Sequence, residues 1–347
     1  MPALKTSGKL ANRRPVPRTE EACTGQGVAV VFGRLRAGLF GICMAALVAV
    51  MPACSDEQPQ METVVSEVNN LDRPEIVDVL FHPIKTGRVP GPEGSVDIDI
   101  TVAEGVSLGC RLFTNSLIAP TLIFFHGNGE TVPDYDGIGP FYVQEGMNFL
   151  VTDYRGYGWS TGKPLTSAML ADSNSLFLQL KDWLAANGYT GPLFVMGRSL
   201  GSASAIEVAV SHSDDLTGLI IESGFAQTLP LAKTLGVDLE QFGITEEMTF
   251  ANASKIERFI KPTYILHGQR DQLIPLWQAE TLAARSGAKN REFQVVPGAD
   301  HNTLIAVAGR VYFQAISQFV QKAAGIAPDW RDRRRAFKAK QAEQAGR

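Results

Sequence analysis

The chain is poor in the residues that build metal centres and disulfide frameworks. Its 347 residues include 4 cysteines and 5 histidines. No two histidines stand at the i, i+4 spacing that places two ligands on one helix face, and no two cysteines are close enough for a zinc knuckle. We therefore expect no metal ion and no other cofactor.

A surplus of positive charge is missing as well. Residues 1–53 hold 7 lysines and arginines against 2 acidic residues, so residues 54–347 carry 25 against 34, a formal charge of −9. Domains that bind nucleic acid present basic surfaces to the phosphates. This balance excludes nucleic acid as the expected partner. Within residues 54–347, only the stretch 328–347 is basic, and we expect it to form a solvated helical tail.

Internal repeats and low-complexity runs are also absent. With 45% hydrophobic and 20% charged residues, the composition is that of a globular protein with a core. Val96–Ile100 alternates apolar and polar residues, and Gly105 turns the chain into the apolar segment Val106–Phe113. This pattern predicts a hairpin ahead of the main part of the fold.

From Thr121 onward, continuous apolar runs alternate with amphipathic segments, which predicts an α/β protein whose mostly parallel sheet has helices on both faces. The expected strands are Thr121–Phe125, Met147–Thr152, Leu193–Met196, Leu219–Ile221, Thr263–Leu266 and Glu292–Val296. The expected helices are Ser167–Ala186, Ser199–Ser211, Leu276–Ser286 and Thr303–Ala324. Phe225–Ile260 separates two strands and predicts a short cap. The apolar residues of this cap either pack a helical insertion or line an acyl pocket.

Gly197–Gly201, with the sequence G-R-S-L-G, is the most informative motif. It follows the apolar run Pro192–Met196 and leads into an expected helix. A strand, G-x-S-x-G and a helix together resemble the nucleophile elbow of α/β-hydrolases. Glycines on both sides make room for a strained turn that presents the serine. Ser199 is therefore the candidate nucleophile.

A serine nucleophile needs a general base, which an acid orients, and in this fold the chain order is serine, acid, histidine. His301 lies in the loop after the last expected strand and is the candidate base. His267 ends a buried strand and is expected to be structural, while His212 follows a helix and is expected to face solvent.

Asp271 follows the penultimate strand and is the candidate acid. Glu222, at the end of the preceding strand, is a competitor, because some hydrolases place the acid there. Asp300 is the immediate neighbour of His301 and would have to fold back to reach its ring.

Acyl transfer also needs donors for the developing oxyanion. A glycine-rich turn, His126–Gly129, follows the strand Thr121–Phe125. The expected oxyanion hole consists of the backbone N–H groups of Asn128 and of Leu200, the residue after the nucleophile. His126 precedes the elbow in the chain, so we expect it to brace the turn.

These motifs occur in the order of one known family. They are His126–Gly129 (H-G-N-G), Asp153–Ser160 (D-Y-R-G-Y-G-W-S), Gly197–Gly201, His267–Asp271 (H-G-Q-R-D) and Gly298–Asn302 (G-A-D-H-N). From about Phe81 to Gly325 the chain resembles the α/β-hydrolase-domain serine hydrolases, a group that includes protein depalmitoylases. The resemblance implies an α/β-hydrolase fold and a triad of Ser199, Asp271 and His301. Gly129 replaces the alanine usual in the family, which implies a looser turn.

The N-terminal region has the features of a signal peptide. The apolar run Leu39–Met51 follows two arginines and ends just before Cys54. This run is shorter than the roughly 18–20 residues that cross a bilayer. Cys54 resembles the lipidated cysteine of bacterial lipoproteins, which predicts a membrane anchor facing the periplasm, and Ser55 favours the outer membrane. Plain secretory cleavage, giving a soluble periplasmic or secreted protein, is the alternative. Once the signal is removed, Cys110 has no disulfide partner except the lipidated position.

The expected organisation is a signal peptide at 1–53, a tether at 54–75, an α/β-hydrolase domain at 76–327 and a basic tail at 328–347. The expected activity is that of a serine hydrolase that cleaves esters or thioesters of small-molecule or acyl substrates. An amidase or peptidase would use the same triad. A non-catalytic binding lipoprotein on the same fold is the third alternative, and the complete triad opposes it.

Overall fold

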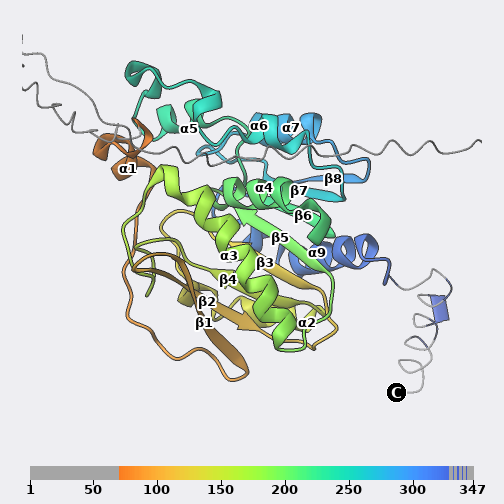
Figure 1. Ribbon diagram of the computed structural model, residues 1–347. Coiled ribbons are helices and arrows are strands. Elements are labelled where there is room, and N and C mark those ends of the chain that lie inside the picture. The colour runs from red at the N-terminus through yellow and green to blue at the C-terminus, as the bar shows by residue number, and fades with distance from the viewer. Residues whose placement is uncertain (1–69, 328–330, 332–333, 336–337, 339–340, 342–347) are drawn as a thin grey trace, which may run out of the picture. The chain divides into compact units, whose positions relative to one another are not determined.

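The computed structural model describes residues 70–327 and, beyond them, 331, 334, 335, 338 and 341. At its centre lies an eight-stranded sheet with the order β1-β2-β4-β3-β5-β6-β7-β8 (Figure 1). The strands are β1 Ser95–Ala103, β2 Val106–Phe113, β3 Thr121–Phe125, β4 Asn148–Thr152, β5 Leu193–Arg198, β6 Gly218–Glu222, β7 Thr263–Gly268 and β8 Arg291–Val296. β1 and β2 form the expected hairpin, and β2 runs antiparallel to β4. The six strands β3 to β8 are parallel to one another.

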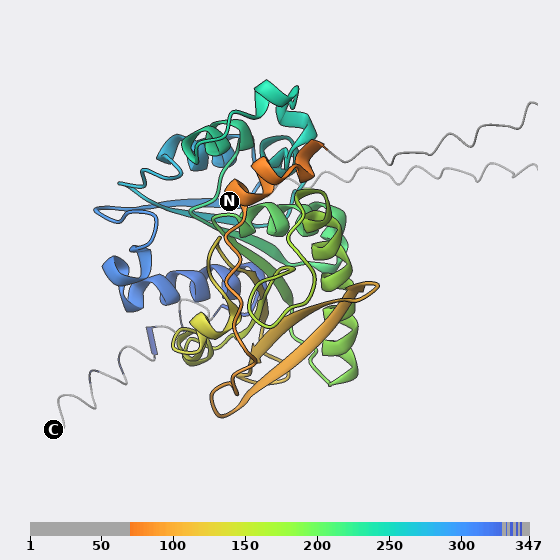
Figure 2. The same ribbon diagram turned by 90° about the vertical axis from the view of Figure 1, so that its left-hand side faces the viewer.

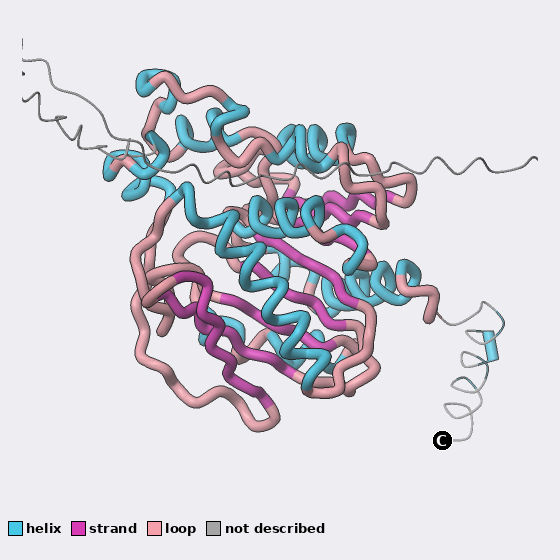
Figure 3. The backbone as a smooth tube through the Cα atoms, viewed as in Figure 1, coloured by secondary structure: helices cyan, strands magenta, loops and turns pink. Residues whose placement is uncertain are grey.

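Both faces of the sheet are covered, which explains the unbroken apolar strands. Ile123 and Phe125 point into a core beneath α3 (Thr166–Ala186), α4 (Gly201–Ser211) and α7 (Leu276–Arg285). Leu122 and Phe124 point the other way, into a core beneath α2 (Gly139–Gln144) and α9 (Arg310–Ala323). Successive side chains of a strand face opposite sides, so both sets must be apolar. Figure 3 shows the strands between these helical layers. The fold is that of an α/β-hydrolase.

The described chain begins with a 3₁₀ turn, η1 (Asn70–Asp72), and the helix α1 (Pro74–Leu80). Ile76 and Leu80 are buried, and the Asp72 carboxylate accepts a hydrogen bond from the backbone N–H of Ser167 at the start of α3 (2.9 Å). The expected domain boundary at residue 76 therefore falls inside α1. The signal peptide and most of the tether lie outside the described residues, as does most of the basic tail.

Two expectations about helices are wrong in detail. Ser199–Ser211 was expected as one helix, but α4 begins at Gly201, because Ser199 occupies the turn with φ 53°. Thr303–Ala324 was also expected as one helix, but Gly309, with φ 55°, divides it into α8 (Leu304–Ala308) and α9. The short helices α1 and α2 were not predicted.

The segment Phe225–Ile260 forms the expected short cap, which lies near α1 at one end of the molecule (Figure 2). It contains α5 (Thr228–Thr234), η4 (Leu239–Phe242), η5 (Glu246–Met248) and α6 (Asn252–Ile256). Phe225, Leu231 and Phe250 are buried in the core shared with α3 and α4. Packing of a helical insertion therefore accounts for these large apolar residues of the cap.

Cys110 lies in β2 and is fully buried, and burial raises the pKa of its thiol well above the usual value. A protonated, inaccessible thiol is unreactive. No helix in the described part of the chain has both the length and the hydropathy to cross a membrane.

Candidate active site

Ser199 occupies a strained turn between β5 and α4. Its φ of 53° lies in the left-handed region, which is costly for a residue with a Cβ atom. The flanking glycines allow the turn, because a Cβ atom on Gly197 would lie 2.3 Å from the Gly201 carbonyl oxygen. A Cβ atom on Gly201 would lie 2.1 Å from the carbonyl oxygen of Phe125. The backbone N–H of Ser199 donates to the Glu222 carbonyl (2.9 Å), which fixes the turn to β6.

A continuous hydrogen-bond chain joins Ser199, His301 and Asp271. Ser199 Oγ lies 2.9 Å from His301 Nε2, and His301 Nδ1 lies 2.7 Å from Asp271 Oδ2. A carboxylate only accepts hydrogen bonds, so the proton belongs on Nδ1 and the Nε2 lone pair faces the serine hydroxyl. Asp271 is held in turn by the N–H groups of Leu273 and Ile274 (3.0 and 2.8 Å). The arrangement can deprotonate Ser199 as it attacks a carbonyl carbon.

The two competing carboxylates have other partners. Glu222 accepts a hydrogen bond from the Tyr312 hydroxyl (2.5 Å) and lies 3.4 Å from Arg198 Nε. Burial raises the pKa of the Glu222 carboxyl. Asp300 is exposed and accepts hydrogen bonds from the Asn302 N–H and the Thr303 hydroxyl (3.0 and 2.8 Å). The structure therefore places Asp271, of the three candidates, against the His301 ring.

The other two histidines that follow Ser199 in the chain have structural surroundings. His267 Nε2 lies 2.7 Å from the Ile274 carbonyl oxygen and 3.3 Å from Asp271 Oδ2, and burial lowers the pKa of its ring. His212 was expected to face solvent, but its ring stacks on Phe177 at 5.0 Å between centroids and is partly buried. An apolar neighbour on α3 thus holds this ring.

The glycine-rich turn after β3 is held by its side chains. His126 lies between the Gly127 carbonyl oxygen (2.8 Å) and Asp153 Oδ1 (3.1 Å), which is the bracing role expected of it. Asn128 Oδ1 accepts hydrogen bonds from the His82 N–H (2.8 Å) and the Tyr157 hydroxyl (2.7 Å). The segment that follows α1 is thus hydrogen-bonded to the turn.

The expected oxyanion donors remain available. Within the described residues, no hydrogen bond engages the backbone N–H of Asn128 or of Leu200. Gly129 has φ 74°, a conformation that favours glycine over the alanine usual in the family. The departure therefore suits the turn that the structure adopts.

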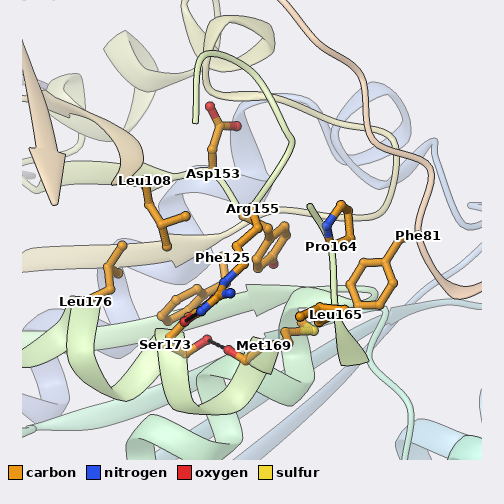
Figure 4. Close-up of a pocket in the computed structure, with 12 residues that line it drawn as sticks. Phe81, Leu108, Phe125, Asp153, Arg155, Pro164, Leu165, Met169, Ser173 and Leu176 are labelled. Carbon is orange, nitrogen blue, oxygen red and sulfur yellow. Dashed lines mark hydrogen bonds and ion pairs between the residues drawn. The ribbon is translucent and has the colours of Figure 1, made fainter. Parts of the chain in front are cut away.

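A small apolar cavity lies between the sheet and α3 (Figure 4). Phe125, which ends β3, and Tyr154, whose hydroxyl donates to the His126 carbonyl (2.7 Å), place it beside the glycine-rich turn. Its volume of about 20 Å³ holds roughly one water molecule. At this volume the cavity is too small for an acyl chain, and Leu165 and Met169 lie together at one side of it in Figure 4.

Comparison with known proteins agrees with this fold. A family model described as serine aminopeptidase, S33 (Hydrolase_4), matches residues 118–237. Protein bem46 of Schizosaccharomyces pombe is 29% identical over 207 residues, which cover 58% of this chain and 67% of that protein. Human alpha/beta hydrolase domain-containing protein 17B is 27% identical over 211 residues, covering 58% and 66%. Lysophosphatidylserine lipase ABHD12 of Xenopus tropicalis is 26% identical over 302 residues and 77% of each chain. The chain is similar to α/β-hydrolases in sequence and shares their fold.

Solved structures share the fold of this hydrolase. The esterase Pf2001 of Pyrococcus furiosus superposes with a TM-score of 0.57 at 21% identity, covering 70% of this chain and 98% of the esterase. Est1E of Butyrivibrio proteoclasticus, solved with ferulic acid bound, gives 0.54 at 19% identity, covering 65% and 98%. At these identities the likeness concerns the fold alone.

The sequence motifs did not reveal a charged cluster next to the hydrogen-bond chain of Ser199, His301 and Asp271. Arg198, the first variable residue of G-x-S-x-G, contacts both Glu130 and Glu222, and its guanidinium also donates to the His301 carbonyl. A signal was present, since an arginine at the end of an otherwise apolar strand needs a buried acceptor, and Glu130 follows the glycine-rich turn directly. The pairing itself depends on the register of β5 against β6, which sets Arg198 opposite Glu222.

Proposed function

We propose that this hydrolase cleaves carboxylic esters or thioesters through an acyl-enzyme formed on Ser199. The observation that carries the proposal is the unbroken hydrogen-bond chain from the strained Ser199 through His301 to Asp271. All three side chains are buried to at least nine-tenths, which strengthens the electrostatic interactions among them. The relative named a lipase agrees with this class of reaction.

The reaction follows from the geometry in two balanced steps. Ser199 Oγ attacks the acyl carbon while its proton passes to His301 Nε2, and the tetrahedral oxyanion accepts hydrogen bonds from the N–H groups of Asn128 and Leu200. His301 then gives the proton to the departing alcohol or thiol. A water molecule attacks the acyl-enzyme in the same way and releases the acid. Asp271 holds the imidazole in the required tautomer and stabilises its charged form.

The matching family model favours a second candidate, an aminopeptidase with the same triad. Such an enzyme needs a carboxylate near the nucleophile to bind the substrate's ammonium group. Three carboxylates at this edge of the sheet are already engaged: Asp271 with His301, and Glu130 and Glu222 with Arg198. This occupation favours the ester substrate.

A pair of substrates with the same acyl group tests the proposal. We expect the purified protein to hydrolyse p-nitrophenyl esters and to react with a fluorophosphonate, and Ser199→Ala to lose both activities. The corresponding p-nitroanilides and aminoacyl anilides should react far more slowly than the esters. Faster turnover of the aminoacyl anilides would make the protein an aminopeptidase. Full ester turnover by Ser199→Ala would refute the serine mechanism. A wild type that hydrolyses none of these substrates and does not react with the fluorophosphonate would indicate a non-catalytic binding protein.

We also propose that Cys54 carries a lipid that anchors the hydrolase to a membrane facing the periplasm. The support is the sequence pattern around Cys54 and the burial of α1, which joins the following segment firmly to the domain. A single acyl chain binds a membrane only marginally, so stable anchoring requires the several chains of a bacterial lipoprotein.

A further inference from the structure

The guanidinium group of Arg198 joins three separate segments around Ser199. It contacts the Glu130 carboxylate through Nη1, and through Nη2 it donates to the His301 carbonyl oxygen (3.1 Å) and to Asn302 Oδ1 (2.9 Å). Its Nε lies 3.4 Å from Glu222 Oε1. The side chain is 12% exposed, so these charge-assisted bonds are largely shielded from water. One planar group thus connects the elbow, the loop that carries His301 and the carboxylate beside the glycine-rich turn.

Glu130 extends this connection to the predicted oxyanion donors. Its Oε2 accepts hydrogen bonds from the Gly127 N–H (2.8 Å) and from the Tyr135 hydroxyl (2.6 Å). Burial alone would raise the pKa of Glu130, but the charge of Arg198 and the bond from Tyr135 outweigh it and lower that pKa. An anionic Glu130 therefore holds Gly127, the residue directly before Asn128. Arg198 also lies close to the turn itself, since a Cβ atom on Gly127 would be 2.5 Å from Nη1.

We propose that Arg198 is a positioning residue. It holds the glycine-rich turn, which carries the predicted oxyanion donor Asn128, and the loop that carries His301 in place relative to Ser199. This inference rests on the proposed serine mechanism. The donors of an oxyanion hole act when the oxyanion forms, so a small displacement of the turn affects the transition state much more than bound substrate. Loss of the guanidinium should therefore lower kcat and leave KM almost unchanged.

A purely structural role predicts a different pattern. Arg198 also balances the buried carboxylate of Glu222 and the half-buried one of Glu130, so its removal should destabilise the fold whatever it does for catalysis. Arg111 provides a matched control, because it is fully buried, lies in β2 and binds the carboxylates of Asp97 (2.6 Å) and Asp136 (2.7 Å). A variant of Arg111 reports the cost of losing a buried arginine outside the site.

The experiment compares Arg198→Lys, Arg198→Met and Arg111→Met with the wild type. The concentration of active sites is counted by fluorophosphonate titration, and kcat and KM are measured on a p-nitrophenyl ester well below each Tm. Lysine keeps the charge but has no planar fork to bridge Glu130 and the His301 carbonyl. We expect Arg198→Lys to retain most of the Tm yet to lose about 10- to 100-fold in kcat, the range for a displaced turn or one weakened donor. Arg111→Met should lower Tm and keep the kcat per active site.

Two further measurements separate positioning from folding. A boronic acid forms a tetrahedral adduct with the serine, and its affinity should fall in Arg198→Lys by the same factor as kcat/KM. A cavity of about 170 Å³ lined by Arg198 and Glu130 gives a small cation access, so guanidinium ions should restore part of the kcat of Arg198→Ala. If the Met variant does not fold, Glu130→Gln, which weakens the same connection, should show the same loss in kcat.

The outcomes distinguish this inference from the proposed function. An unchanged kcat per active site in Arg198→Lys and Arg198→Met, or a loss that lies mainly in KM, would overturn the positioning role. Full recovery of kcat by lysine would also overturn it, because charge alone would then suffice. Retained ester turnover in Ser199→Ala would instead refute the serine mechanism itself.

Discussion

Among single residues, Glu222 ends β6 and Asp271 lies in the loop after the neighbouring strand β7, but the two carboxylates differ in what they contact. Asp271 lies 2.7 Å from His301 Nδ1, while Glu222 is bonded to Tyr312. We expect Asp271→Asn to lower kcat about 10⁴-fold, because an amide no longer holds the histidine tautomer. Glu222→Gln should change kcat little. Steady-state kinetics of both variants decide the assignment, and a large loss in Glu222→Gln with a small one in Asp271→Asn would reverse it.

Glu222 should instead influence how stability depends on pH. Burial raises the pKa of Glu222 in the folded protein above its ordinary value of 4.5. The folded state then binds this proton more tightly than the unfolded state, so the stability that the group contributes is complete below about pH 4.5 and is lost as the pH rises through the folded pKa. Glutamine does not titrate, so the free energy of unfolding of Glu222→Gln should rise relative to the wild type as the pH increases above 4.5. Urea unfolding at a series of pH values measures this difference, and a difference that is constant or falls with pH would contradict the expectation.

At the scale of elements, the elbow depends on how closely α4 and β3 approach. A Cβ atom at Gly201 would meet the Phe125 carbonyl oxygen at 2.1 Å, and both are backbone positions that cannot rotate away. We expect Gly201→Ala to cost about 1–3 kcal/mol, the range for overpacking, and to lower kcat by displacing Ser199. Gly137→Ala is the control, because nothing lies within 4 Å of its Cβ position and its φ is not positive. Thermal unfolding and ester turnover should separate the two variants, and equal behaviour would show that the elbow tolerates the change.

The sequence predicts the elements whose residue pattern is set by burial. It does not predict the features that depend on a single residue or a single contact. Each of the strands from β3 to β8 lies within two residues of its expected range at either end. For β3 to β7 the reason is burial, because a sheet covered on both faces needs continuous apolar runs. The elbow motif and the loop positions of Asp271 and His301 also follow from chain order. The break at Gly309 did not, since a glycine inside an amphipathic pattern is compatible with an unbroken helix. The pairing of Arg198 with Glu130 did not either, because it joins residues that are distant in the chain.

At the scale of the whole molecule, the proposed lipid anchor at Cys54 can be tested. Cys54 precedes the described residues, and the chain enters them through η1 and α1, where Leu71 and Ile76 are buried. Because α1 packs into the core, a tether from Cys54 would hold the folded domain directly. We expect mass spectrometry of the mature protein to show a lipidated N-terminal Cys54, and Cys54→Ala to leave the membrane fraction while keeping its ester turnover. The retained turnover follows because Cys54 has no part in the hydrogen-bond chain of Ser199. A lipid-free N-terminus, or a variant that still sediments with membranes, would make the protein one that is secreted without this anchor.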